Sequence, residues 1–178
     1  MVWIDLHISL NSLIWMFIPT FMIHDMEEIV FVESWMNKHY ETARLAIPKP
    51  FRRGFDSFRN IKSSQFAVAV ALELIIFIPT TFAAADDHRY LFFIGFNAIL
   101  LIHVFTHLSQ SILFRKYTPG VVTAVFVTLP YTVYLFQRLS EMDILNWSLL
   151  NNGLSVGVFL LPLVILGHLI GKRIVPKW

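Results

Sequence analysis

Residues 65–84 of the chain, QFAVAVALELIIFIPTTFAA, contain a single ionisable side chain, Glu73. Twenty helical residues span about 30 Å, which is the thickness of the hydrocarbon core of a bilayer. A backbone in lipid has to satisfy its own hydrogen bonds, so an apolar stretch of this length is expected to be a helix. The stretch therefore predicts a membrane-spanning helix, and the carboxylate inside it needs a partner.

Comparable apolar runs recur along the whole chain of 178 residues. Hydrophobic residues make up 56% of the chain and charged residues 15%, whereas a soluble domain has about 25% charged residues. We predict a single all-α domain, a polytopic membrane helix bundle with about five transmembrane helices. The predicted spans are about residues 8–31, 65–84, 90–114, 118–136 and 154–171.

The basic residues orient this bundle. Most of the 14 Lys and Arg residues lie in three segments: the link 32–64, the pair Arg115 and Lys116, and the C-terminal tail. Positively charged loops stay in the cytoplasm. We therefore expect the N-terminus outside, the C-terminus inside and a long basic cytoplasmic loop at 32–64. Within this loop, residues 48–60 mix Phe with Arg at roughly helical spacing and are expected to lie on the inner membrane surface, with a solvated loop as the alternative.

Composition also limits the classes of function. The chain has no cysteine, which excludes disulfides and thiolate metal sites. Its net charge of +2 is too small to indicate a nucleic-acid partner. We expect a multi-pass integral membrane protein, of the cytoplasmic membrane if bacterial. The bilayer is its surrounding partner, and homo-oligomerisation stays open.

Ionisable residues from four predicted spans fall in the inner half of the bilayer. A charge at the bilayer centre costs about 3 kcal/mol even on lenient scales, so such residues mark a functional site. His24, Glu27 and Glu28 share one helix face at i, i+3 and i+4, and His103 and His107 stand at i, i+4. Asp25 is turned about 100° away and is a weaker candidate. The candidate metal ligands are His24, Glu27, Glu28, Glu73, His103, His107 and His168.

Imidazole and carboxylate donors without thiolate suit zinc, iron or manganese. A catalytic zinc needs only three protein ligands plus water, so this larger set favours two divalent ions over one. Di-iron bundles use an i, i+3 pair of Glu and His, and His24 with Glu27 has that spacing in reversed order. Structural roles are the alternatives: Glu28 paired with Lys38 or Arg115, a neutral hydrogen-bonded Glu73, and an interfacial His168.

The motif His24-Asp-Met-Glu27-Glu28 resembles the one for which the HXXEE domain family is named. The stretch at 97–130, with an Asn and a His on one helix and then Tyr117-x-Pro119-Gly120, is also similar to that family. The likeness covers about residues 10–170. It implies a small multi-spanning membrane protein and supports the choice of residues. Pro119 and Gly120 also suit a plain structural role at the start of a helix.

The leading hypothesis is a membrane-embedded metalloenzyme acting on a lipid-like or other hydrophobic small molecule. The reaction would be oxygen-dependent oxidation, as in an oxidase or hydroxylase, or hydrolysis by metal-bound water. In a hydrolase, Glu28 or Glu27 would serve as the catalytic base. Two alternatives are a transporter of protons or metal ions using the same Glu and His residues, and a haem or quinone protein.

Overall fold

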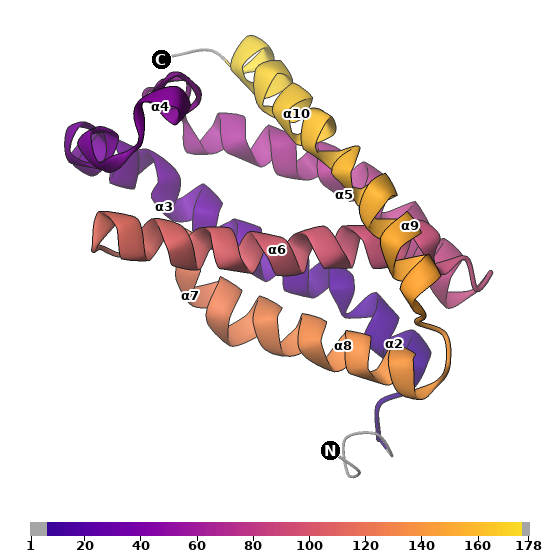
Figure 1. Cartoon of the computed structure of the whole chain (residues 1–178). Coiled ribbons are helices and arrows are strands. Elements are labelled where there is room, and N and C mark those ends of the chain that lie inside the picture. Colours follow the sequence, from indigo (N-terminus) through magenta and orange to yellow (C-terminus); the bar gives the residue numbers. More distant parts are fainter. Residues whose placement is uncertain (1–6, 176–178) are drawn as a thin grey trace.

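The computed structural model describes residues 7–175, which form helices joined by turns and contain no strand in that range (Figure 1). The all-α prediction is confirmed. The elements in chain order are α2 (Leu10–Trp15), α3 (Phe17–Ala46), α4 (Lys49–Asp56), α5 (Ser63–Ala85), α6 (Tyr90–Phe114), α7 (Val121–Thr123), the π-helical segment η1 (Ala124–Thr128), α8 (Leu129–Glu141), α9 (Trp147–Val158) and α10 (Leu160–Ile174).

Four helical stretches within residues 7–175 are long and apolar enough to cross a membrane: Ser63–Ala85, Tyr90–Phe114, Val121–Glu141 and Trp147–Ile174. Large apolar side chains such as Ile112 and Phe126 are 75% exposed on their outer faces. A soluble protein rarely shows continuous apolar surface of this kind. This is the architecture of a multi-pass membrane protein.

The last of these stretches is longer than the predicted span at 154–171 and is bent. Helix α9 ends at Val158, and α10 begins at Leu160. Pro162 lacks the N–H that would bond the Val158 carbonyl in a continuous α-helix, which explains the break. A proline also follows the π-helical segment, at Pro130, where the carbonyl of Phe126 loses its usual donor in the same way.

The first span and the segment after it depart most from the prediction, because most of the predicted loop 32–64 is helical, in α3 and α4. Helices α2 and α3 meet at Met16, and α3 continues to Ala46, well past the predicted end at residue 31. Hydropathy indicates where a helix leaves lipid rather than where it ends. The extension is stabilised by its own buried cluster, which consists of Trp35, Met36, Tyr40, Ala43 and Ile61, with Phe55 and Phe58 packed against it.

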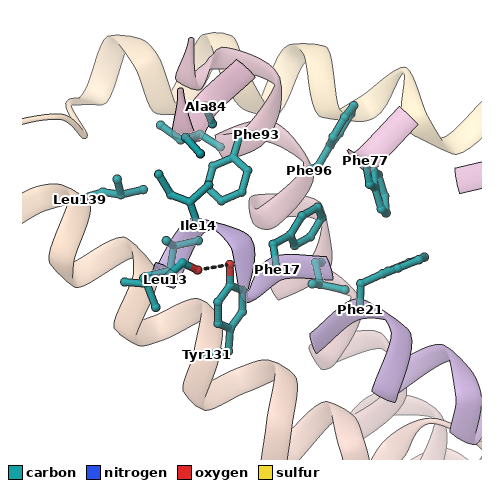
Figure 2. Packing of buried hydrophobic residues seen from close by; sticks show 14 of the residues in the cluster. Leu13, Ile14, Phe17, Phe21, Phe77, Ala84, Phe93, Phe96, Tyr131 and Leu139 are labelled. Atoms are coloured by element: carbon teal, nitrogen blue, oxygen red, sulfur yellow. Dashed lines mark hydrogen bonds between the residues drawn. The ribbon is translucent and has the colours of Figure 1, made fainter. Parts of the chain in front are cut away.

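One end of the bundle is filled by aromatic side chains (Figure 2). Phe17 of α3 and Phe93 of α6 are both 0% exposed, and their ring centroids lie 5.6 Å apart in an edge-to-face arrangement. Phe77 of α5 lies 5.0 Å from Phe17. Tyr131 of α8 donates its hydroxyl to the Leu13 carbonyl at 3.3 Å and so ties α8 to α2. We call this region the aromatic end.

Glycines set the position of α9 and α10 along one side of the bundle, with α8 on the other side (Figure 1). A Cβ at Gly157 would lie 2.6 Å from the Gly95 carbonyl oxygen, and one at Gly167 would lie 3.1 Å from Cα of Ala69. The spacings Gly153-x-x-x-Gly157 and Gly167-x-x-x-Gly171 allow two backbones to approach closely, as in many membrane helix pairs. The pairing fixes the rotation of α10 against α5 and of α9 against α6.

Candidate metal centre

Four side chains from two helices converge on one point in the bundle. They are His24 and Glu28 of α3, and His103 and His107 of α6. One donor atom of each lies within 4.8 Å of the corresponding atom of every other member. Both pairs have i, i+4 spacing, so each helix presents two donors on a single face. We call these four residues the His/Glu cluster.

The distances inside the cluster are short. Nε2 of His107 lies 2.8 Å from Nε2 of His103 and 3.2 Å from Oε1 of Glu28. The ring centroid of His24 lies 4.8 Å from that of His107. Ligands of a tetrahedral ion with bonds of about 2.0–2.1 Å are about 3.3 Å apart. The cluster therefore needs only small side-chain adjustments to surround one ion.

A chain of hydrogen bonds orients His24. Glu27 accepts from the backbone N–H of Thr123 at 2.7 Å and from its hydroxyl at 2.6 Å. A hydroxyl has one hydrogen, so the Thr123 oxygen that donates to the carboxylate accepts from Nδ1–H of His24, 3.2 Å away. This leaves the Nε2 lone pair of His24 free, and Nε2 is buried with no hydrogen-bond partner among residues 7–175. A free lone pair on a fixed imidazole is what a metal ligand needs.

A threonine hydroxyl also orients the ring of His103. The Thr106 hydroxyl donates to the His103 carbonyl at 2.7 Å and lies 3.2 Å from Nδ1 of the same residue. With its hydrogen used on the carbonyl, this oxygen accepts from Nδ1–H. The remaining nitrogen, Nε2, then presents its lone pair toward His107. Two threonines thus select the tautomer of two histidines.

The turn between α6 and α7 closes the cluster from the side. Gly120 has φ +87°, and a Cβ at this position would lie 2.6 Å from Cε1 of His107 and 3.0 Å from Oε1 of Glu28. Only glycine fits both the backbone conformation and the space. Tyr117 anchors the turn, because its hydroxyl donates to Glu27 at 2.7 Å and its carbonyl accepts from Nε1 of Trp35 at 2.6 Å.

The other predicted ligands lie outside the cluster. Glu27 points to the α7 end and is occupied by Thr123 and Tyr117. Glu73 of α5 is near enough to Glu28 for electrostatic interaction but is not one of the four convergent donors. His168 of α10 packs edge-on against Phe66, with centroids 4.9 Å apart, and its Nδ1 is buried without a partner in the described chain.

A cavity of about 630 Å³ adjoins the cluster between α3, α5, α6 and α10, with residues of α4 at one end. Its walls are mainly aromatic and aliphatic, including Phe21, Phe77 and Val164. Glu28 and His103 of the cluster form part of the wall. The volume lies in the range of pockets that bind small organic molecules. The convergent donors therefore face a space for an apolar ligand.

Sequence reasoning missed the residues that support the cluster. Gly120 was expected only to suit the start of a helix, and Thr123 was not among the candidate residues. Thr106 and Trp35 carried no signal, because a hydroxyl or an indole becomes informative only when its partner is known. The spacing of Thr106 three residues after His103 is the one sequence clue, because it places the hydroxyl on the same helix face.

Comparison with known protein families supports the family that the motif suggests. Residues 15–135 match the family described as "Protein of unknown function with HXXEE motif". The chain belongs to the HXXEE family. The predicted resemblance is thereby confirmed, and the His and the two Glu of the family motif are His24, Glu27 and Glu28.

A relative of this HXXEE protein is "Uncharacterized protein YrkK" of Bacillus subtilis (strain 168). The two chains are 23% identical over 160 residues, which cover 86% of this chain and 92% of that protein. No solved structure matches the chain. The family match covers the whole His/Glu cluster and the Gly120 turn, whereas α9 and α10 lie beyond the matched residues.

Proposed function

We propose that the protein is an integral membrane metalloenzyme that acts on a hydrophobic small molecule or lipid. One observation carries the proposal: donor atoms of His24, Glu28, His103 and His107 converge within 4.8 Å beside an apolar cavity of about 630 Å³. Three imidazoles and a carboxylate gathered inside an apolar bundle are costly without a cation to bind, and His24 and His107 are fully buried. The cavity gives the bound ion access to a substrate.

The donor set favours iron or zinc, with manganese as a third choice. The cluster offers four ligands to one ion. A second ion, which the sequence analysis favoured, remains a prediction, because it would require Glu73 or His168 to turn toward Glu28. The ion would supply either a polarised water for hydrolysis or oxygen chemistry for oxidation.

The two glutamates of the motif take different roles in this proposal. Glu28 is a ligand at the cavity wall. Glu27 is a positioning residue, because both of its oxygens hold the α7 end and through Thr123 fix His24. Glu73 also lines the cavity. It is the carboxylate free to take a proton from a bound water or substrate if the reaction is hydrolysis.

We further propose that α2 and the first part of α3 form a fifth span, with the N-terminus outside and the C-terminus inside. Lys62 donates to Glu33 at 2.7 Å and Arg44 to Asp56 at 2.7 Å, so the basic segments gather around α4 and the ends of α3 and α5. A cytoplasmic position for this end follows from the positive-inside rule. It would place the His/Glu cluster in the inner half of the bilayer.

Elemental analysis of protein purified without added metal tests the proposal. We expect about one iron or zinc per chain, and a loss of at least about tenfold on His107→Ala, because one of four ligands is removed. His88→Ala is the matched control, since His88 is an exposed histidine in the turn before α6. Less than about 0.2 metal per chain in the native protein would remove the proposal.

A further inference from the structure

The cavity beside the His/Glu cluster is acidic as well as apolar. Three carboxylates line it, those of Asp25, Glu28 and Glu73. No Lys or Arg of residues 7–175 is among the lining residues. Low-dielectric walls strengthen the field of such charges inside a cleft. Its lining therefore suits a cation better than an anion.

Asp25 is the least expected of these carboxylates. It is 6% exposed, and no hydrogen bond or ion pair joins it to another described residue. The charged groups that it faces are Glu28 of its own helix and Glu73 of α5, both acidic. Glu73 likewise has no basic partner in the described chain, and the group that it faces is Glu28. A buried carboxylate without a partner indicates a ligand that supplies one.

The carboxyl groups divide between the two proposed ligands. Glu28 belongs to the His/Glu cluster and would bind the ion. Asp25 and Glu73 are not among the convergent donors, and they line the cavity without a basic partner among residues 7–175. A ligand that donates several N–H bonds would satisfy both of them.

We infer that the cavity binds an amphiphile with one ammonium group, a hydrophobic amine. Its ammonium lies between Asp25 and Glu73, and its apolar chain occupies the wall of Phe21, Phe77 and Phe96. The aromatic faces add cation–π attraction near the head group. The inference rests on the proposed function, because it leaves Glu28 to the ion and assigns Asp25 and Glu73 to the ligand, and it names the substrate class of that site.

Three probes of equal chain length test this inference on the full-length protein in detergent: dodecylamine, 1-dodecanol and dodecanoic acid. All three partition into the micelle, so their differences report the head group. We expect dodecylamine at saturation to raise Tm by about 5 °C. Dodecanol should raise it less, and dodecanoic acid should not raise it. Equal shifts for the amine and the alcohol would overturn the inference without any variant.

Glu73→Gln sharpens the test, because the side chain keeps its shape and loses its charge. We expect the amine to bind at least about tenfold more weakly to this variant, since one partner of a buried charge pair is lost. The control is Glu41→Gln, an exposed carboxylate of α3 paired with Arg59 outside the cavity. An amine preference that survives both Glu73→Gln and Asp25→Asn would contradict the inference.

Metal content measured on the same samples separates the two proposals. A metal-free protein that still prefers the amine would end the metalloenzyme proposal and keep the amine site. A protein with one ion per chain and no preference for the amine would keep the metalloenzyme proposal and end the amine site. Two ions per chain would also overturn the inference, because the second ion would occupy the carboxyl groups of Asp25 and Glu73 that are assigned to the ammonium.

Discussion

The faces that α3 and α6 turn toward each other are aromatic at one end and polar at the other. Residues that follow one another at helical spacing on these faces are Phe17, Phe21, His24 and Glu28 on α3, and Phe93, Phe96, Leu100, His103 and His107 on α6. The backbone geometry is the same along both faces. In the aromatic end the rings fill the space between the helices, whereas in the cluster nitrogen lone pairs converge and a cavity opens beside them.

This contrast teaches that the two ends of one helix pair serve different purposes. Close packing of Phe17 and Phe93 holds α3 and α6 in register. The same register brings His24 and Glu28 opposite His103 and His107. We therefore expect substitutions in the two ends to affect separate quantities: the free energy of unfolding in the aromatic end, and metal affinity in the His/Glu cluster.

The largest expected effect comes from Phe93→Ala in the aromatic end. Removing a fully buried ring should lower the free energy of unfolding by about 3–5 kcal/mol. The fraction that remains folded should keep its metal. Reversible denaturation in mixed micelles and elemental analysis measure the two quantities. Phe92→Ala is the control, because Phe92 is 51% exposed. Equal losses from both variants would show that the aromatic end does not hold the pair together.

Gly120→Ala should affect both quantities. A side chain at φ +87° costs about 1–2 kcal/mol of stability. Its Cβ would also displace His107 and Glu28, so we expect metal affinity to fall more than about tenfold. Denaturation and metal titration with a competing chelator check the two effects. Gly54→Ala is the matched control, since a Cβ at Gly54 meets nothing within 4 Å. Unchanged affinity in Gly120→Ala would show that the turn does not shape the cluster.

Thr123→Val should reduce metal affinity about 10–100-fold with little change in stability, because His24 loses the oxygen that accepts from its Nδ1–H. Chelator competition measures the affinity. Thr80→Val offers the comparison, as the Thr80 hydroxyl bonds only carbonyls of its own helix. A similar affinity for both variants would mean that Thr123 does not orient His24.

The smallest effect concerns pH at the α4 end. The Arg44 guanidinium, and after it the Tyr40 hydroxyl, hold the pKa of Asp56 below its usual value. A lowered pKa in the folded state stabilises the fold above the pKa of the unfolded chain, and this contribution is lost as pH falls below about 4. We expect Asp56→Asn to flatten the dependence of Tm on pH in that range. An unchanged slope would show that the Arg44 pair does not contribute.

The sequence could predict much of the fold. The apolar runs located α5 and α6 almost to the residue, because lipid demands a minimum apolar length and helices are the only way to satisfy the backbone there. The apolar runs did not predict the continuation of α3 to Ala46, because that part of the helix is stabilised by packing around Trp35 and Tyr40 rather than by lipid. Five spans and the orientation stay predictions.

The sequence predicted a level along each helix for the candidate ligands, but not the direction in which their side chains point. A rise of about 1.5 Å per residue gives the level of a side chain in the membrane. Its direction depends on how each helix is rotated against its neighbours. Gly167 packs against Ala69, and His168 packs against Phe66 rather than joining the His/Glu cluster. No pattern in the sequence of α10 alone indicates this.

The sequence by itself determined a helical membrane bundle with imidazole and carboxylate groups at one level, because hydropathy and helical spacing are local properties of the chain. The tertiary structure alone decided which of those groups meet, since only packing sets helix rotation. It brought His24 and Glu28 to His103 and His107, left Glu73 on the cavity wall, and placed Gly120 where no larger residue fits.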